Sequence, residues 1–267
     1  MPTPVYSHGH HESVLRSHRT RTAADSAAYL IPHLAPGQTL LDVGSGPGTI
    51  TADLAGLVAP GRVIALETSE QILGHTRAGV SAAGTTNVEY LVGDVHALDL
   101  PDDAFDVVHA HQVLQHLPDP VAALKEMVRV CRPGGIVAVR DADYAAFTWF
   151  PENPQLDRWL ELYRANARAN SAEPDAGRRL LAWAHEAGCT DVTATASTWL
   201  YAEPDARQTW GLGWADRILT SAAADQLLAS GRADRAELER ISDAWKAWAA
   251  EPDGWFVILH GELIIRT

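Results

Sequence analysis

The residues best suited to chemistry are three glycines and an acid within residues 40–49, which read LLDVGSGPGT. The apolar residues that open this stretch predict a strand, and Gly44, Gly46 and Gly48 follow it at alternate positions. Glycine adopts positive φ without steric cost and lets a ligand approach the backbone closely. A nucleotide-like ligand could therefore sit on this turn, against the N-terminus of the helix that follows. The dinucleotide fingerprint G-x-G-x-x-G fits poorly, because Thr49 stands where its third glycine belongs.

Further acids and a histidine stand at the ends of the next apolar runs. Glu67 ends the second run, Asp94 follows the third, and His111 ends the fourth. An acid at the tip of the second strand can accept hydrogen bonds from both hydroxyls of a ribose. The runs that we interpret as strands after the first are 61–67, 88–95, 105–111 and 133–139.

With these four motifs in order, the chain resembles the class I methyltransferases that use S-adenosylmethionine, over residues 36–142. The resemblance implies that Gly44, Ser45 and Gly46 hold the methionine end of the cofactor. It implies that Asp42 braces this turn or helps to receive the cofactor amino group. The implied cofactor-binding residues are Asp42, Gly44, Ser45, Gly46, Glu67, Thr68, Gly93, Asp94, Val95 and His111.

The same resemblance gives individual roles to the residues at the other strand ends. Glu67 would bind the ribose hydroxyls. Asp94 would accept from the adenine amino group while the Val95 amide contacts the ring. His111 would lie near the methionine moiety and the reactive methyl group.

The expected fold class is α/β: a Rossmann-like, doubly wound, seven-stranded sheet, mostly parallel with an antiparallel last strand, with helical cap elements. The last strand is predicted at 255–259 and 263–265, and a half-buried strand at 192–201. We expect a single methyltransferase domain over residues 1–267. Its parts would be an N-terminal helical cap (1–35), the cofactor-binding core (36–142), and helical insertions over the acceptor pocket (143–174 and 203–250).

Composition narrows the partners and the compartment. The net charge of −13 disfavours nucleic acid as a partner, because phosphate binding needs clustered Lys and Arg. No apolar stretch reaches the ~20 residues that span a bilayer, so no membrane insertion is expected. The N-terminus lacks the apolar core of a signal peptide, and Cys131 and Cys189 are interpreted as thiols, which favours the cytoplasm. The sequence leaves a homodimer open.

The acceptor pocket is expected from segments that mix aromatic and hydrogen-bonding side chains. The candidates are Tyr6, His8, His18, Tyr144, Trp149 and Trp210. For Trp149, Phe150 and Trp210, pocket lining and core packing both remain open. Trp245 and Trp248 belong to an apolar stripe at helical spacing and are expected to pack the inserted helix on the core.

A phenol or amine acceptor has to lose a proton, and a histidine with an unperturbed pKa near 6.5 suits that role. His111 and His11 are the candidate catalytic residues, and the sequence does not choose between them. His116 is interpreted as a structural hydrogen-bonding residue. His8, His10 and His11 crowd the N-terminus without any recognised ligand spacing, so no metal is expected.

The predicted function is methyl transfer from S-adenosylmethionine to an O, N or C atom of a small-molecule acceptor. The resemblance is nearest to the small-molecule branch that includes the quinone-biosynthesis methyltransferases. Residues 111–116 (HQVLQH) depart from the Arg-Asn-containing segment of those enzymes, which favours a specialised metabolite over a quinone.

Two alternatives remain. The same fold could bind S-adenosylmethionine without methyl transfer, as a regulator or in another reaction. An NAD-dependent oxidoreductase should instead show G-x-G-x-x-G and a Tyr-Lys or His-acid arrangement, yet Tyr144 and Tyr163 have no lysine at helical spacing.

Overall fold

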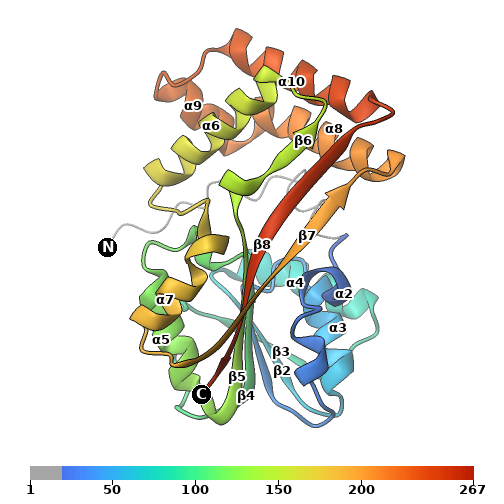
Figure 1. Cartoon of the computed structure of the whole chain (residues 1–267). Coiled ribbons are helices and arrows are strands. Elements are labelled where there is room, and N and C mark those ends of the chain that lie inside the picture. The colour runs from blue at the N-terminus through green and yellow to red at the C-terminus, as the bar shows by residue number, and fades with distance from the viewer. Residues whose placement is uncertain (1–19) are drawn as a thin grey trace. The chain divides into compact units, whose positions relative to one another are not determined.

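A computed structural model describes residues 20–267 (Figure 1), and their contacts divide into two compact units. We call residues 20–141, Ala176–Ser197 and His260–Thr267 the sheet unit. Ala142–Asp175 and Thr198–Leu259 form the aromatic unit. Among the described residues the sheet unit contains two buried apolar clusters and the aromatic unit one, and the two units are described separately below.

Parallel strands form the centre of the sheet, as the apolar runs of the sequence predict. They are β1 (Leu40–Val43), β2 (Val63–Glu67), β3 (Val88–Val92), β4 (Phe105–His111) and β5 (Cys131–Ala142). The strand order is β3-β2-β1-β4-β5-β8-β6, and β7 pairs with β8. All four residues of β1 are buried, because a central parallel strand is covered on both faces. Val43 is opposite Leu66 of β2 and Ala110 of β4, so the carboxyl ends of these strands lie together.

The remaining strands are β6 (Thr148–Phe150), β7 (Asp191–Tyr201) and β8 (Trp255–Arg266). The expected Rossmann-like, mostly parallel sheet with an antiparallel last strand is confirmed. The described chain has eight strands instead of the expected seven, because β6 adds to β8 in a segment predicted to be helical insertion. Trp149 stacks on its cross-strand partner Phe256, with ring centroids 5.5 Å apart, and such pairs stabilise a short edge strand.

Helices cover both faces of the parallel strands in the sheet unit. Figure 1 shows α2 (Ala23–Ser26) and α3 (Thr49–Val58) beside one face, and α5 (Pro120–Val130) and α7 (Leu180–Glu186) beside the other. Helix α4 (Glu70–Ala82) also belongs to this unit. Single turns of 3-10 helix occur at η1 (Ile31–His33), η2 (Leu114–His116) and η4 (Ala176–Arg179).

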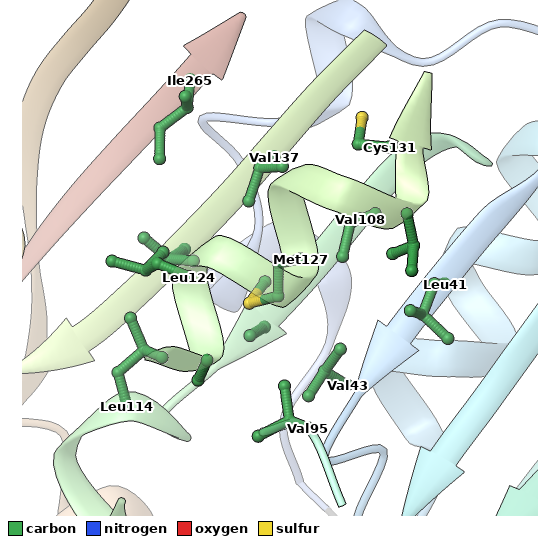
Figure 2. Close-up of a cluster of buried hydrophobic side chains, with 14 of the residues drawn as sticks. Leu41, Val43, Val95, Val108, Leu114, Leu124, Met127, Cys131, Val137 and Ile265 are labelled. Atoms are coloured by element: carbon green, nitrogen blue, oxygen red, sulfur yellow. The ribbon is translucent and has the colours of Figure 1, made fainter. Parts of the chain in front are cut away.

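The apolar side chains of α5 fill the space between this helix and the sheet. Figure 2 shows Leu124 and Met127 of α5 with Val108 and Val137 of the sheet; all four are fully buried. Asp119 caps the helix by accepting from the Ala122 amide at 2.9 Å, and proline follows at the first helical position, as the sequence predicts. Burying a side chain of this size stabilises the fold by roughly 1.5–3 kcal/mol.

The aromatic unit is built from four helices around stacked and edge-on rings. They are α6 (Pro154–Ala169), α8 (Pro204–Thr220), α9 (Ala222–Ala229) and α10 (Arg235–Ala250), preceded by the turn η3 (Tyr144–Ala146). The fully buried ring of Trp159 meets Trp214 at 4.6 Å and Trp245 at 4.9 Å, both edge-to-face. The expected packing role of Trp245 and Trp248 is confirmed, with 0 % and 2 % of each residue exposed.

Within residues 20–267, no helix combines the length and the apolar character needed to cross a membrane.

Candidate functional site

The glycine turn joins β1 to α3, and its three glycines differ in what surrounds them. All three have positive φ: 71° at Gly44, 52° at Gly46 and 82° at Gly48. A Cβ on Gly44 would lie 2.5 Å from a methyl of Val113, and one on Gly48 would lie 2.5 Å from the Thr76 carbonyl oxygen. A Cβ on Gly46 would meet nothing nearer than a backbone oxygen at 4.0 Å. Of the three, Gly46 is therefore the one that leaves space for a ligand, whereas the other two allow close packing inside the protein.

Helix α4 holds this turn in place. The Thr76 hydroxyl donates to the Gly46 carbonyl at 2.7 Å, and the Ser45 hydroxyl lies 3.2 Å from that of Thr76. Ser45 is 7 % exposed. Gly48 is the N-cap of α3 and provides no side-chain cap, so the first amides of this helix face the turn without one.

Asp42 braces the turn from within the protein. Its carboxylate accepts from the Thr51 hydroxyl at 2.6 Å through Oδ2, and its Oδ1 lies 2.8 Å from Nδ1 of His109. Asp42 and His109 are opposite each other in the β1–β4 register, and both are buried. Both carboxylate oxygens therefore have protein partners, which supports bracing over reception of a ligand amine. Sequence reasoning missed His109, although a histidine in an apolar strand two residues before His111 was a usable signal.

Glu67 connects the tip of β2 to the glycine turn. One carboxylate oxygen accepts from the Gly46 amide at 2.8 Å, and the other accepts from the Thr68 amide at 3.2 Å. Burial raises the pKa of Glu67 above its ordinary value, and the two amide hydrogen bonds offset part of that rise. The Gly93 amide donates to the Glu67 carbonyl at 2.9 Å, so the end of β3 is attached to the same place.

Asp94 lies exposed just beyond β3. Its Oδ1 accepts from the His96 amide at 2.9 Å and lies 2.7 Å from Nδ1 of the His96 ring. Burial raises the pKa of Asp94, but these interactions outweigh it and hold the pKa below its ordinary value. Oδ2 has no hydrogen bond to any described residue. Val95 is buried in the cluster of Figure 2. His96 was not predicted from the sequence, although an Asp with a His two residues later is a local pattern that could have shown it.

His111, at the tip of β4, is 8 % exposed and lies beside a guanidinium. Its Nδ1 is 3.5 Å from an Arg140 nitrogen, and its ring centroid is 6.2 Å from that of His260. Burial first, and the charge of Arg140 second, hold the pKa of His111 well below its ordinary value. The ordinary histidine pKa near 6.5 therefore does not apply to this residue. The imidazole is neutral at physiological pH and is a weak proton acceptor, so its role as a base stays a prediction.

The predicted acceptor-site residues that the structure describes, Tyr144, Trp149 and Trp210, lie in the aromatic unit. Tyr6, His8, His11 and His18 lie outside the described residues. In the aromatic unit, Tyr144 stacks on Tyr163 with ring centroids 4.2 Å apart, and Trp210 stacks on Tyr201 at 4.5 Å. Trp149, described above with β6, stacks within the same unit. Their role toward an acceptor stays a prediction. Across residues 20–267, no three His, Cys, Asp or Glu side chains are grouped to hold a metal ion.

The strand ends thus bring together an open glycine turn and two carboxylates. Backbone amides and the space beside Gly46 suit the polar end of a small ligand, and the carboxylates of Glu67 and Asp94 accept from hydroxyl and amino groups. A nucleoside offers both kinds of donor, on its ribose and on its base. The residues present therefore fit an adenosine-bearing ligand.

Comparison with known proteins adds evidence that is independent of this geometry. Residues 41–139 match the family model described as methyltransferase domain. The chain is 31 % identical to an uncharacterised methyltransferase of Schizosaccharomyces pombe, over 98 % of this chain and 96 % of the relative. It is 35 % identical to a demethylmenaquinone methyltransferase of Lactococcus lactis, over 49 % of this chain and 50 % of that protein.

A solved structure shares the fold. Phosphoethanolamine N-methyltransferase 2 of Haemonchus contortus, in complex with phosphomonomethylethanolamine and S-adenosylhomocysteine, superposes with a TM-score of 0.54 at 16 % identity. The match covers 87 % of this chain and 50 % of that one.

Proposed function

Because the chain belongs to the class I S-adenosylmethionine-dependent methyltransferases and has S-adenosylmethionine as its cofactor, we propose that it methylates an O, N or C atom of a small-molecule acceptor. We propose a specialised metabolite carrying a phenol, an amine or an activated carbon. We also propose that the enzyme works in the cytoplasm. We propose no nucleic-acid partner, and the net charge of −13 supports this second point.

The observation that carries the proposal is the bond from the Gly46 amide to Glu67, 2.8 Å long, which places a carboxylate beside the one open glycine of the turn. Glu67 would hold the ribose hydroxyls, and Asp94 would accept from the adenine amino group through its free Oδ2. Gly44, Ser45 and Gly46 would hold the methionine end, while Asp42 keeps the turn rigid through Thr51 and His109. Rigidity matters, because correct alignment of the reacting groups can supply roughly 7–11 kcal/mol of the barrier reduction.

The cofactor supplies a sulfonium-activated methyl group, so the protein has to align the acceptor, exclude water and accept a proton where the acceptor carries one. His111 ends β4, and we propose that the reactive methyl group lies near this strand end. Its lowered pKa suits a neutral hydrogen-bonding side chain that orients the acceptor. Because one relative is a demethylmenaquinone methyltransferase, a demethylquinone belongs in the panel of test acceptors.

Two measurements test this proposal. In calorimetric titration, S-adenosylmethionine should bind and NAD should not. In the second, the protein is incubated with S-adenosylmethionine and a panel of phenols, amines and a demethylquinone, and S-adenosylhomocysteine is quantified. Acceptor-dependent S-adenosylhomocysteine formation supports methyl transfer. Tight cofactor binding with no product from any acceptor class favours the alternative of a binding protein.

A further inference from the structure

A buried polar cluster lies at the ends of β4 and β5 in the sheet unit, where His111 ends β4. The Gln112 amide donates to the Arg140 carbonyl at 2.7 Å, and Gln112 has a positive φ of 55°. This bend leads the chain from β4 into the turn η2. Val113, between the bend and η2, is the residue that packs against Gly44 of the glycine turn.

Asp141, at the end of β5, has one carboxyl oxygen in use and one without a partner. Its Oδ1 accepts from the Gln115 amide at 3.1 Å, which holds η2 in place. Its Oδ2 is buried and has no hydrogen-bond partner among residues 20–267, and Asp141 as a whole is 0 % exposed. A buried polar atom without a partner destabilises the fold by roughly 1–3 kcal/mol, so Oδ2 is a candidate contact for a ligand.

Gln115 provides a second unpartnered oxygen on the same turn. Its side-chain nitrogen lies 3.0 Å from Nε2 of His116, which is an acceptor for it. Its Oε1 is buried without a partner among the described side chains and backbone, and Gln115 is 3 % exposed. In the carboxylate form of Asp141, Oδ2 and the Gln115 Oε1 are therefore two buried acceptors without a partner among the described residues, on residues joined by the bond from the Gln115 amide to Oδ1.

We propose that Asp141 and Gln115 form a subsite that binds an amine group of the methyl acceptor, an inference that rests on the proposed function and narrows its substrate class. An ammonium or amine nitrogen can donate one hydrogen to each oxygen. A hydroxyl has one hydrogen and satisfies one oxygen only, and a quinone carbonyl has none. The charge of an ammonium also matches a carboxylate, since charge-assisted hydrogen bonds are about twice as strong as neutral ones.

The charged groups around this cluster include two cations, Arg21 and Arg140, and the acid Glu262. Arg140, the cation beside Asp141, is paired with Glu262 at 3.1 Å and bonded to Ser197 at 3.2 Å. Burial holds the pKa of His116 at about 3 and that of His111 well below its ordinary value, so both rings are neutral near pH 7. Burial also raises the pKa of Tyr29, which therefore stays protonated.

Asp141 is then the group in this cluster that exchanges a proton near neutral pH. Burial raises the pKa of Asp141 to about 8, so its carboxyl is mostly protonated when no cation is bound. An arriving ammonium favours the carboxylate, and the carboxyl proton passes to the buffer. Binding of one ammonium group should therefore release up to about one proton at pH 7.

The test is calorimetric binding of benzylamine to the protein saturated with S-adenosylhomocysteine, at pH 7 in two buffers of different ionisation enthalpy. Benzyl alcohol is the matched probe without the charge and the second hydrogen. Benzyltrimethylammonium keeps the charge and has no N–H. Wild type should bind benzylamine roughly tenfold or more tightly than either matched probe and release a proton as it does so.

Asp141→Asn keeps a carbonyl oxygen for the Gln115 amide and removes the ionisable oxygen. It should lower the benzylamine affinity to that of benzyl alcohol and abolish the proton release. Gln115→Met keeps the bond from the backbone amide to Asp141 and removes Oε1. It should weaken the binding of benzylamine several-fold. This variant provides a test even if Asp141→Asn fails to fold. Asp53→Asn, an exposed acid that accepts from the Ala23 amide, is the matched control and should change nothing.

Three outcomes overturn the inference: equal affinity of wild type for benzylamine and either matched probe, unchanged benzylamine binding in Asp141→Asn, or proton release that persists in that variant. None of these measurements needs turnover. Methyl transfer without amine discrimination would therefore refute the subsite alone, and amine discrimination without methyl transfer would refute the proposed function alone.

Discussion

At the scale of single residues, Glu67 is the side chain whose chemistry bears most directly on the cofactor. Its carboxylate lies against the Gly46 amide, in the position from which it would meet a ribose. We expect Glu67→Gln to weaken the binding of S-adenosylmethionine about tenfold or more, because hydrogen bonds to a charged group contribute roughly 1.5–3 kcal/mol. The amide oxygen of glutamine can still accept from Gly46, so the fold should persist.

Calorimetry measures this affinity, and Glu89→Gln is the control. Glu89 is exposed on the neighbouring strand β3, where it bonds Arg62 at 3.5 Å. An unchanged dissociation constant for S-adenosylmethionine in Glu67→Gln would contradict the assignment of Glu67 to the ribose. An equal loss of affinity in both variants would contradict it as well.

Asp141 gives a prediction about stability and pH. Its pKa is about 8 in the folded protein, above the usual value near 4, because burial disfavours the charged form. A raised carboxyl pKa means that the folded state retains a proton that the unfolded state has lost. The contribution of Asp141 to stability is therefore complete below pH 4 and is lost as the pH rises toward 8, by about 1.4 kcal/mol per pH unit at most.

Urea unfolding at pH 5, 6, 7 and 8 should show a steeper fall in unfolding free energy for wild type than for Asp141→Asn. Other titrating groups contribute equally to both proteins and cancel in the difference. Parallel curves for the two proteins would contradict the raised pKa.

At the scale of elements, the glycine turn depends on the loop between β4 and η2. Gly44→Ala and Gly46→Ala both place a Cβ at positive φ, which costs roughly 1–2 kcal/mol. Gly44→Ala adds a clash with Val113, whereas Gly46→Ala adds none. We expect Gly44→Ala to lower the unfolding free energy more than Gly46→Ala does. Relative to the stability that each variant loses, we expect Gly46→Ala to weaken cofactor binding more than Gly44→Ala does.

Chemical unfolding and cofactor titration of the two variants give this comparison. Val113→Ala removes the clashing methyl, so it should recover part of the stability lost in Gly44→Ala and none of that lost in Gly46→Ala. Equal recovery in both backgrounds would show that the turn and the loop are not packed as described.

At the scale of the whole molecule, the two units can be followed separately by intrinsic fluorescence. The chain has nine tryptophans, and Trp183 is the one that lies in the sheet unit. Tryptophan emission therefore reports mainly on the aromatic unit. Trp245 is fully buried there, so Trp245→Ala should lower the free energy of the fluorescence-detected unfolding transition by about 3–5 kcal/mol.

Trp255→Ala is the control, since Trp255 belongs to the same unit and is 39 % exposed. It should cost clearly less than Trp245→Ala. Similar losses in both variants would contradict the assignment of Trp245 to the core of that unit.

The apolar patterns of the sequence are enough to predict the parallel core and the residues at its edge. The apolar runs show where β1 to β5 lie, and each of Glu67, Asp94 and His111 is found at or just beyond the end of a strand. These features are local: strand propensity, glycine in a tight turn, and a capping acid before proline at Asp119 all act within a few residues. The family resemblance rests on the same local features, and the comparisons confirm it.

The partners of these residues depend on contacts that form when the whole chain folds. Asp42 meets His109 from a strand 67 residues away, and β6 is a strand because it can pair with β8. Gly44 and Gly46 look alike in sequence, yet one packs on Val113 and the other faces open space. The shifted pKa values of His111 and Asp141 arise from burial, which depends on every segment that surrounds a site. Register and burial are set by contacts between distant parts of the chain, and a pattern of neighbouring residues does not contain them.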